Sequence, residues 1–236
     1  MGMPLRDSPL GYDPSAFPPL AVAVDIVVLA ASARGLHVLT AKRADQPHRG
    51  KHALPGVLVQ VDEALDDAAQ RAVETKVGLR ADVRQFGAFG AVNRDPRMRM
   101  VSIGYAALVP WRRLEASLGD DQQLCRIDGG LVRDRNSRKL TLPFDHDQIV
   151  QSAAEYLHSD LDHSLWSFGL LEPEFTLREL QEVHEAVRGR TVNKPAFRKR
   201  LLESGKLEAT GRPEVGSKFR PAELYRVRKE WHDGER

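Results

Sequence analysis

The stretch LPGVLVQVDEALDDAAQRAVETKVGL, residues 54–79, decides the fold of this chain. A Pro-Gly turn opens it, and a helix-forming segment follows at residues 66–77. Asp66 or Asp67 is suited to start that helix, because a side-chain oxygen there accepts a hydrogen bond from a free backbone N–H. Gly78 stands where a left-handed C-terminal cap belongs. We therefore predict a loop that leads into a short helix.

This stretch resembles the Nudix box, a loop-helix motif that holds divalent metal against a nucleoside diphosphate. The residues at matching spacing are Leu54, Pro55, Gly56, Glu63, Arg71, Gly78 and Leu79. Two apolar strand patterns before it, residues 21–31 and 36–43, agree with the hairpin that opens that fold. The resemblance implies an α/β fold, the Nudix α/β/α sandwich. The alternative is a solvated amphipathic helix with no such role.

The metal-binding part of the motif departs from the Nudix pattern. In that family the ligands are glutamates at i, i+3 and i+4, which share one helix face, and Mg²⁺ prefers such carboxylate oxygens. The corresponding positions here hold Ala72, Thr75 and Lys76. Glu74 points to another face, and Val57 replaces the usual second glycine. We therefore expect the Nudix fold without a metal, a cofactor or catalytic residues.

Composition limits the class of protein. The chain has 236 residues, 42% of them hydrophobic, which is enough for one large or two ordinary domains with a proper core. Cys125 is the only cysteine, so no internal disulfide is expected. The longest apolar run, residues 20–33, is interrupted by Asp25 and is too short to span a bilayer. With no secretory signal recognised, we expect a cytoplasmic protein.

Charge is distributed unevenly along the chain. The formal net charge is +2, yet residues 186–229 contain 13 Lys or Arg against 4 Asp or Glu, a balance of +9. A basic segment of that density favours a polyanionic partner. The alternative is an ordinary solvated surface.

A second cluster of cations lies in a predicted loop within residues 83–110. Arg94, Arg97 and Arg99 surround Pro96 there, and the guanidinium fork matches phosphate geometry. We interpret this segment as an anion-binding loop, with a solvated turn as the alternative. Phe89 either stacks on a base or ribose or belongs to the core. The predicted ligand-binding residues are Arg43, Lys76, Phe89, Arg94, Arg97 and Arg99.

The middle of the chain reads as short strands up to about residue 145, including residues 139–145, with a turn at Gly129 and Gly130. Residues 111–123 read as a helix or an irregular polar segment. A helix is then predicted at residues 146–157, and His146 at its start is expected to cap the helix or lie on the surface.

A second unit begins near Ser164. Thr176 and Glu179 form a capping box that opens a helix ending at Gly189. A basic helix at residues 194–203 and a hairpin follow, the order of a winged helix-turn-helix. The predicted DNA-binding residues are Thr191, Asn193, Lys194, Arg198, Lys199, Arg200, Lys218 and Arg220, with the last two on the wing. The alternative is a helical cap or a dimer interface.

The whole chain resembles the NrtR family of Nudix-related regulators of NAD metabolism. The segments that carry the resemblance are VDIVVL (24–29), LHVLTAKR (36–43), LPG (54–56), NRDPR (93–97), LPFDH (142–146), FTLRELQEVHEAVRG (175–189), NKPAFRKRLLESG (193–205) and LYRV (224–227). His52-Ala53 before LPG and Val57 depart from the pattern. Residues 1–19, rich in Pro and Gly, are predicted to form an irregular leader. The resemblance implies a Nudix-like ligand-sensing domain at 20–160 and a winged helix-turn-helix domain at 161–232.

The resemblance also implies a function. Members of the family sense ADP-ribose or a related nucleotide, repress genes of NAD synthesis or salvage, and bind pseudo-palindromic double-stranded operators as homodimers. No membrane partner is expected. One alternative is an active hydrolase resembling ADP-ribose pyrophosphatases, which would take carboxylates from elsewhere, such as Asp62 or Glu63. The other is a nucleotide-binding module whose C-terminal unit binds protein.

Overall fold

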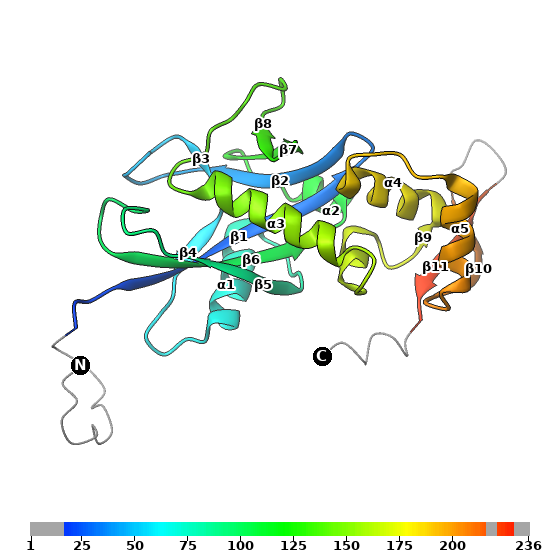
Figure 1. The fold of residues 1–236 in the computed structure, drawn as a ribbon, viewed down its shortest axis with the longest axis horizontal. Coiled ribbons are helices and arrows are strands. Elements are labelled where there is room, and N and C mark those ends of the chain that lie inside the picture. The colour runs from blue at the N-terminus through cyan, green and yellow to red at the C-terminus, as the bar shows by residue number, and fades with distance from the viewer. Residues whose placement is uncertain (1–16, 216–220, 229–236) are drawn as a thin grey trace, which may run out of the picture.

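The structure is a computed structural model and describes residues 17–215 and 221–228. An eight-stranded sheet forms the centre of the larger unit. A smaller unit of helices and a three-stranded sheet lies at the other end of the molecule from the first described residues (Figure 1). The predicted leader at 1–19 falls almost entirely outside the described residues.

The elements follow one another in the order expected for two units. The strands of the larger sheet are β1 (Ala21–Ser32), β2 (Gly35–Lys42), β3 (His52–Ala53), β4 (Gly56–Leu58), β5 (Val83–Phe89), β6 (Met100–Leu108), β7 (Gln122–Asp128) and β8 (Leu131–Arg133). The helices are α1 (Leu65–Val77), α2 (Trp111–Ala116), α3 (His146–Asp160), the 3-10 helix η2 (Trp166–Leu170), α4 (Leu177–Arg188) and α5 (Lys194–Glu203). The smaller sheet contains β9 (Phe175–Thr176), β10 (Leu207–Pro213) and β11 (Glu223–Val227).

The larger sheet is mixed, with the order β5-β6-β1-β2-β7-β8, while β3 pairs with β2 and β4 with β1. β1 and β6 run parallel, with Ala21 opposite Met100 and Leu29 opposite Leu108. The predicted hairpin is confirmed, since β1 and β2 pair antiparallel around the turn before Gly35. β1 is thus an inner strand of the sheet, which explains its nearly continuous apolar sequence.

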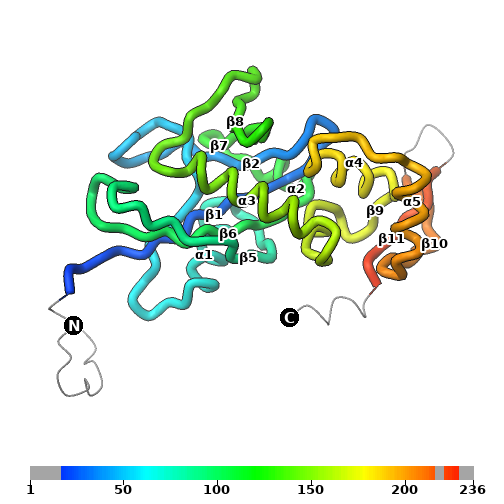
Figure 2. The backbone as a smooth tube through the Cα atoms, in the orientation of Figure 1, coloured from blue at the N-terminus to red at the C-terminus, as the bar shows by residue number. Residues whose placement is uncertain are grey.

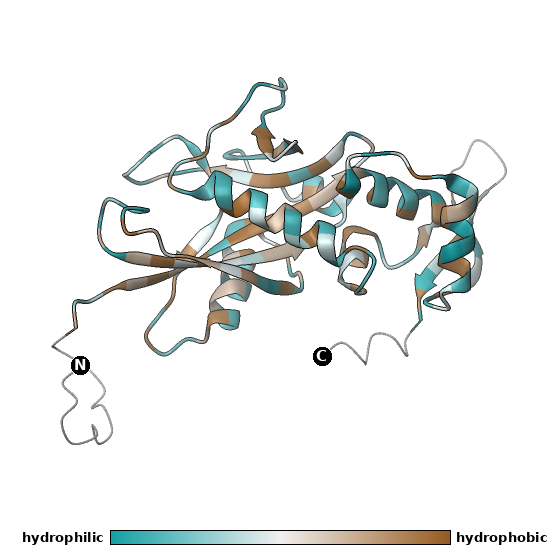
Figure 3. Ribbon diagram, in the orientation of Figure 1, coloured by the Kyte–Doolittle hydropathy of each residue, from teal (hydrophilic) through white to brown (hydrophobic). Residues whose placement is uncertain are grey.

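β1 separates two hydrophobic cores because successive side chains of a strand point to opposite faces. Val24, Ile26 and Val28 pack with α1 in one core. Val27 and Leu29 pack on the other face, with α3 and the smaller unit. Helices therefore cover both faces of the sheet, as the predicted α/β/α sandwich requires, and Figure 3 shows the apolar residues along β1.

The box helix α1 differs from the prediction at its start. It begins at Leu65, after Ala64, and no side chain caps its first turn. Asp66 and Asp67 lie inside that turn, where their charge favours the positive end of the helix dipole. The predicted C-cap is confirmed, because Gly78 adopts a φ of 74°.

Two expectations for the middle of the chain are wrong. Residues 139–145 form no strand, and a single bridge joins Lys139 to Arg133. His146 is not at the surface, since it is buried at the first residue of α3. α3 then runs along the sheet to the smaller unit, as the tube in Figure 2 traces.

The smaller unit has the predicted winged-helix order. The capping box of α4 is present, with the Glu179 backbone N–H donating to Thr176 Oγ1 at 3.1 Å and the Thr176 N–H donating to Glu179 Oε2 at 2.8 Å. β10 and β11 form the hairpin, and β9 adds a third strand that the sequence did not indicate. Phe175, Phe197 and Val227 join the same core as α3. The two units therefore pack as one body.

Candidate effector site and nucleic-acid interface

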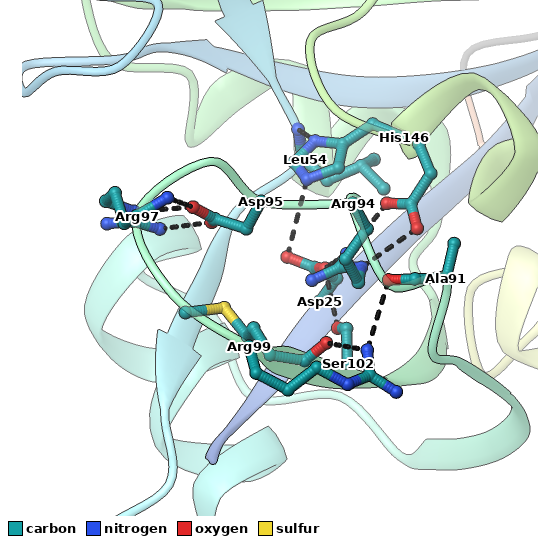
Figure 4. Close-up of polar contacts among 11 residues, drawn as sticks. Asp25, Leu54, Ala91, Arg94, Asp95, Arg97, Arg99, Ser102 and His146 are labelled. Carbon is teal, nitrogen blue, oxygen red and sulfur yellow. Dashed lines mark hydrogen bonds and ion pairs between the residues drawn. The ribbon is translucent and has the colours of Figure 1, made fainter. Parts of the chain in front are cut away.

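A buried polar cluster lies where β1 passes the LPG segment, with Asp25 at its centre (Figure 4). Asp25 Oδ2 accepts hydrogen bonds from Ser102 Oγ of β6 at 2.6 Å and from Arg94 Nη2 at 3.2 Å. Parallel pairing of β1 with β6 brings Asp25 and Ser102 together. A charged carboxylate in this position requires such partners, because an unpaired buried charge is costly.

Arg94 joins the loop before β6 to the start of α3. Its Nε and Nη2 donate to the two carboxylate oxygens of Asp145 at 2.9 and 2.7 Å, and its side chain is only 3% exposed. Burial alone would lower the pKa of Arg94, but the hydrogen bonds and charges of Asp145 and Asp25 outweigh it and raise that pKa. Arg94 is therefore committed to two carboxylates, and a phosphate would have to compete with both.

His146 connects the same cluster to the LPG segment. The Leu54 backbone N–H donates to its Nδ1 at 3.0 Å, so Nδ1 lacks a proton and Nε2 carries it. Nε2 faces Asp25 Oδ1 at 3.7 Å. Burial lowers the pKa of His146, which keeps the ring neutral although Asp25 and Asp145 act to raise it. This histidine holds LPG against α3.

The last residue of the LPG segment, Gly56, has no room for a side chain. A Cβ there would lie 2.6 Å from Asp25 Oδ1 and 2.7 Å from the Val24 carbonyl oxygen. Both contacts are too short for a real side chain, so β4 can pair with β1 at this point only through a glycine. The tight turn thus places the LPG backbone directly over the buried carboxylate.

The other predicted phosphate ligands lie nearer the surface. Arg97 pairs with Asp95 at 2.6 Å and is 47% exposed, whereas Arg99 donates to the carbonyl oxygens of Ala91 and Met100. The Arg43 guanidinium lies 4.9 Å from the ring centre of Phe144. Burial and the charge of nearby Arg97 lower the pKa of Arg43. Arg43 and Arg97 are therefore near enough for the charge of one to act on the other, whereas Arg94 is paired with two carboxylates.

Two predicted ligand-binding residues lie elsewhere. Phe89 is buried in the apolar core beside Phe86, with ring centres 6.0 Å apart, so the core interpretation of this residue fits the structure. Lys76 is exposed on the last turn of α1. Phe144, which sequence reasoning missed, is the half-buried aromatic beside the cluster, with its ring centre 5.3 Å from that of His146.

The box helix does not present the carboxylates that a Nudix metal site needs. Ala72 is fully buried, and Thr75 and Lys76 are exposed without any carboxylate. Glu63 is bonded to Arg71 through both oxygens, at 2.6 and 2.8 Å, and this pairing lowers the pKa of Glu63 to about 2. Within the described residues no group of three His, Cys, Asp or Glu side chains is placed to hold a metal ion. The residues present do not fit Mg²⁺.

The second candidate surface is α5, which projects from the end of the molecule (Figure 1). Phe197 is its only fully buried residue among those described, and Leu201 is half-buried, as predicted. Lys194 and Arg198 are exposed on the outer side. Asn193 caps the helix by accepting a hydrogen bond from the Ala196 N–H at 3.0 Å. The helix is anchored by Phe197 and Leu201 and exposes Lys194 and Arg198 to solvent.

The remaining predicted DNA contacts vary in their surroundings. Lys199 lies 3.8 Å from Glu203, and Arg200 lies 3.9 Å from Asp162. Thr191 is exposed in the turn before α5. Lys218 and Arg220 lie outside the described residues.

Comparison with known proteins agrees with both units. The NUDIX domain family matches residues 19–126, and the family described as the NrtR DNA-binding winged helix domain matches residues 167–227. The chain is 31% identical over 218 residues to the "ADPR responsive transcriptional repressor NtrR" of Acinetobacter baylyi, covering 91% of this chain and 85% of that protein. The chain belongs to the NrtR family. The fold and the order of units expected from the sequence are thereby confirmed.

Solved structures extend the comparison with the NrtR family. The crystal structure of Shewanella oneidensis NrtR complexed with a 27mer DNA matches with a TM-score of 0.77 and 28% identity, covering 88% of this chain and 93% of that one. A MutT/nudix family protein from Enterococcus faecalis, with a TM-score of 0.71 and 23% identity over 90% of this chain and 88% of that one, shows the same fold. An ADP-ribose pyrophosphatase of Methanocaldococcus jannaschii is 31% identical over 132 residues, covering 56% of this chain and 71% of that protein.

Sequence reasoning missed the centre of the cluster. Asp25, Asp145 and His146 meet there from β1 and the start of α3. Two signals were present in the sequence: a single carboxylate interrupts the longest apolar run, and the segment LPFDH ends on these residues. In the described part of the chain, no helix is long and apolar enough to cross a membrane.

Proposed function

We propose that the protein is a DNA-binding transcriptional repressor that responds to ADP-ribose or a related nucleotide and controls genes of NAD biosynthesis or salvage. The observation that carries the proposal is α5, whose exposed cations Lys194 and Arg198 project from the winged helix. A helix of this kind enters the major groove in helix-turn-helix proteins. The similarity to an ADPR-responsive repressor over 91% of the chain supports the same function.

The proposed effector site lies beside the buried cluster, near Arg43 and Arg97. Arg43 and Arg97 supply positive charge there, and their mutual repulsion would be relieved by a diphosphate between them. Asp25, Arg94 and Asp145 form the floor and hold α3 in place. Phe144 offers an aromatic surface at the edge of this floor. A negatively charged nucleotide is the ligand that these residues favour.

We further propose that the Nudix unit does not hydrolyse its ligand. Nudix hydrolysis depends on metal to stabilise charge on the phosphates, and the box helix carries Ala72, Thr75 and Lys76 where the carboxylates would stand. Glu63, one alternative ligand, is held by Arg71. Asp62 is exposed on the loop before α1 and has no second carboxylate in a metal-binding group with it among the described residues.

A homodimer on a pseudo-palindromic operator completes the proposal. A twofold dimer presents two α5 helices, and their separation sets the spacing of the half-sites. An effector alters DNA affinity only if it favours one arrangement of the dimer over another. Because the protein acts on DNA and needs no membrane partner, we place it in the cytoplasm.

The test is DNA binding by the full chain with and without ADP-ribose. A randomised duplex pool is selected on the protein, and the affinity for the selected duplex is measured at several ligand concentrations. We expect sequence-selective binding whose affinity changes with ADP-ribose. An active ADP-ribose pyrophosphatase, favoured by the similarity to the Methanocaldococcus enzyme, would instead release AMP in the presence of Mg²⁺ and show no selective duplex.

A further inference from the structure

Asp162 lies between the two units, in the turn that follows α3. Its carboxylate lies within ion-pair distance of one arginine from each of the helices α4 and α5. Arg188, in the last turn of α4, pairs with Asp162 Oδ2 through Nη2, and Arg200 of α5 lies 3.9 Å from Oδ1. Asp162 thus contacts both α4 and α5.

The surroundings of Asp162 are more enclosed than those of an ordinary surface ion pair. The Arg188 side chain is only 20% exposed, and its Nε is buried without a hydrogen-bond partner. His184 is also buried, with Nδ1 3.9 Å from Asp162 Oδ1. Asp162 is the only carboxylate within ion-pair distance of Arg188 or Arg200 in the part of the chain that the structure describes. Exposed pairs contribute little to stability, but this carboxylate compensates partly buried charge.

The ion pair with Asp162 affects the position of α5, because α5 makes few other contacts with the rest of the protein. Its buried anchor is Phe197, whose ring packs against His184 with centres 4.8 Å apart, and the Arg200 guanidinium carbon lies 5.7 Å from the centre of the same ring. Besides this ring, α5 packs on the core through the half-buried Leu201, and these two contacts lie on one face of the helix, so they leave its angle weakly defined. The ion pair from Arg200 to Asp162 is a further attachment that opposes a change of this angle.

We propose that Asp162 is a positioning residue for sequence-specific DNA binding, which fixes the angle of α5 by tying α4 and α5 to the end of α3. This inference rests on the proposed DNA-binding function of α5. Base-edge contacts depend on the angle at which a helix enters the groove, whereas phosphate contacts by flexible cations tolerate a change of angle. Loss of Asp162 should therefore harm selective binding and spare non-selective binding.

The test compares two duplexes in the full-length protein: the 27-base-pair duplex selected on the wild type and a scrambled duplex of the same length and composition, a length known to be accommodated by the Shewanella protein. Asp162→Asn should lower the ratio of the two affinities roughly three- to tenfold, which lies in the lower part of the range for coupling between contacting groups. Affinity for the scrambled duplex should stay constant or rise, since one negative charge near DNA is removed.

Asp160→Asn is the matched control, because Asp160 is a carboxylate of the same segment that accepts a hydrogen bond from Ser164 and contacts neither α4 nor α5 through an ion pair among the described residues. It removes the same charge and should leave the ratio unchanged. Asp162→Glu keeps the charge and should restore most of the ratio. Equal changes in the ratio for Asp160→Asn and Asp162→Asn, or a wild-type ratio in Asp162→Asn, would overturn the proposal. If the wild type itself selects no duplex, the proposed function fails first.

Discussion

The Leu54 backbone N–H donates a hydrogen bond to Nδ1 of His146 across 92 residues of sequence, at 3.0 Å. This bond joins the LPG turn to the first residue of α3 and fixes which ring nitrogen carries the proton. The neighbouring pair of Arg94 and Asp145 holds the same end of the helix. A ligand that disturbs LPG or Arg94 therefore acts directly on α3, which leads to the winged helix.

Arg97→Ala tests the effector site. Loss of this side chain should weaken ADP-ribose binding by roughly 1–3 kcal/mol, the range for a charge-assisted hydrogen bond. It also leaves the buried Asp95 without its cation, so the ligand effect is measured relative to the ligand-free variant. Ligand-dependent thermal stabilisation measures this effect. Arg99→Ala is the control, because Arg99 donates to backbone carbonyl oxygens of its own loop. An unchanged ligand affinity in Arg97→Ala would remove the loop from the site.

Arg94→Ala should behave differently, as a destabilised protein. The substitution leaves Asp25 and Asp145 without their shared cation, and breaking a buried pair in this way costs roughly 3–5 kcal/mol. Urea denaturation measures the loss directly. Arg94→Lys keeps the charge but cannot make both bonds to Asp145, so we expect an intermediate value. A wild-type free energy of unfolding in Arg94→Ala would show that the cluster is not structural.

Incubation with ADP-ribose and Mg²⁺ should release no AMP above a blank. Restoring the Nudix glutamates meets a structural obstacle, because Ala72 is fully buried. Ala72→Glu buries an unpaired carboxylate and should lower the free energy of unfolding by several kcal/mol, roughly 3–5. Thr75→Glu, at an exposed position of the same helix, should change it by less than about 0.5 kcal/mol. Robust turnover by the wild type would refute the sensor interpretation.

His184 should make stability depend on pH. Burial lowers its pKa from 6.5 to about 4, against the opposing charge of Asp162, so the folded protein resists protonation. The unfolded chain takes up that proton below about pH 6.5. Stability is therefore complete above pH 6.5 and declines as the pH falls toward 4, by about 3 kcal/mol from this group.

Denaturation at several pH values checks this dependence. His184→Leu should flatten the decline between pH 6.5 and 4, whereas His158→Leu, at an exposed position of α3, should not. Other buried histidines add in the same direction, since burial also lowers the pKa of His146 and His37. The slope of His184→Leu should thus be reduced and not abolished. An unaltered slope would contradict the assignment.

Substitutions on α5 should separate base reading from phosphate contact. Arg198→Ala should cost roughly 1–3 kcal/mol and relax specificity at one base pair if Arg198 reads a base edge. Lys194→Ala should lower the salt dependence of affinity by about one unit if it contacts a phosphate. Both are exposed, so stability should not change. Equal affinity of both variants and the wild type at all salt concentrations would move the DNA reader elsewhere.

Asn193 needs a different design because it caps α5. Asn193→Ala removes the cap and costs about 1 kcal/mol of stability whether or not Asn193 touches DNA. Asn193→Ser keeps a capping oxygen and loses the amide. A drop in selective DNA affinity with Asn193→Ser, at unchanged thermal stability, would identify a base contact. No drop would leave Asn193 as a cap alone.

Local features were predictable because their partners are close in sequence. Gly78 ends α1, Thr176 and Glu179 cap α4, and Asn193 caps α5 through residues at most four positions away. The cluster at Asp25 was not, since its bonds span 69 residues to Arg94 and 51 more from Arg94 to Asp145. From the sequence alone, the environments of the three arginines in this loop cannot be distinguished. Only the fold shows that one is buried between carboxylates and the others are not.

The hydrophobic cluster shared by β1, α3, Phe197 and Val227 has a consequence for melting and for modular exchange. A calorimetric scan should show a single endotherm, because neither unit can lose its packing without exposing the other. A chain cut near Ser164 would leave the α3 face uncovered, so the isolated Nudix unit should have a lower free energy of unfolding than the full chain. A chimaera that takes another winged helix must keep the α3 of this chain, because Asp145 and His146 bind its first turn to the Nudix unit, and must match the apolar face of α3.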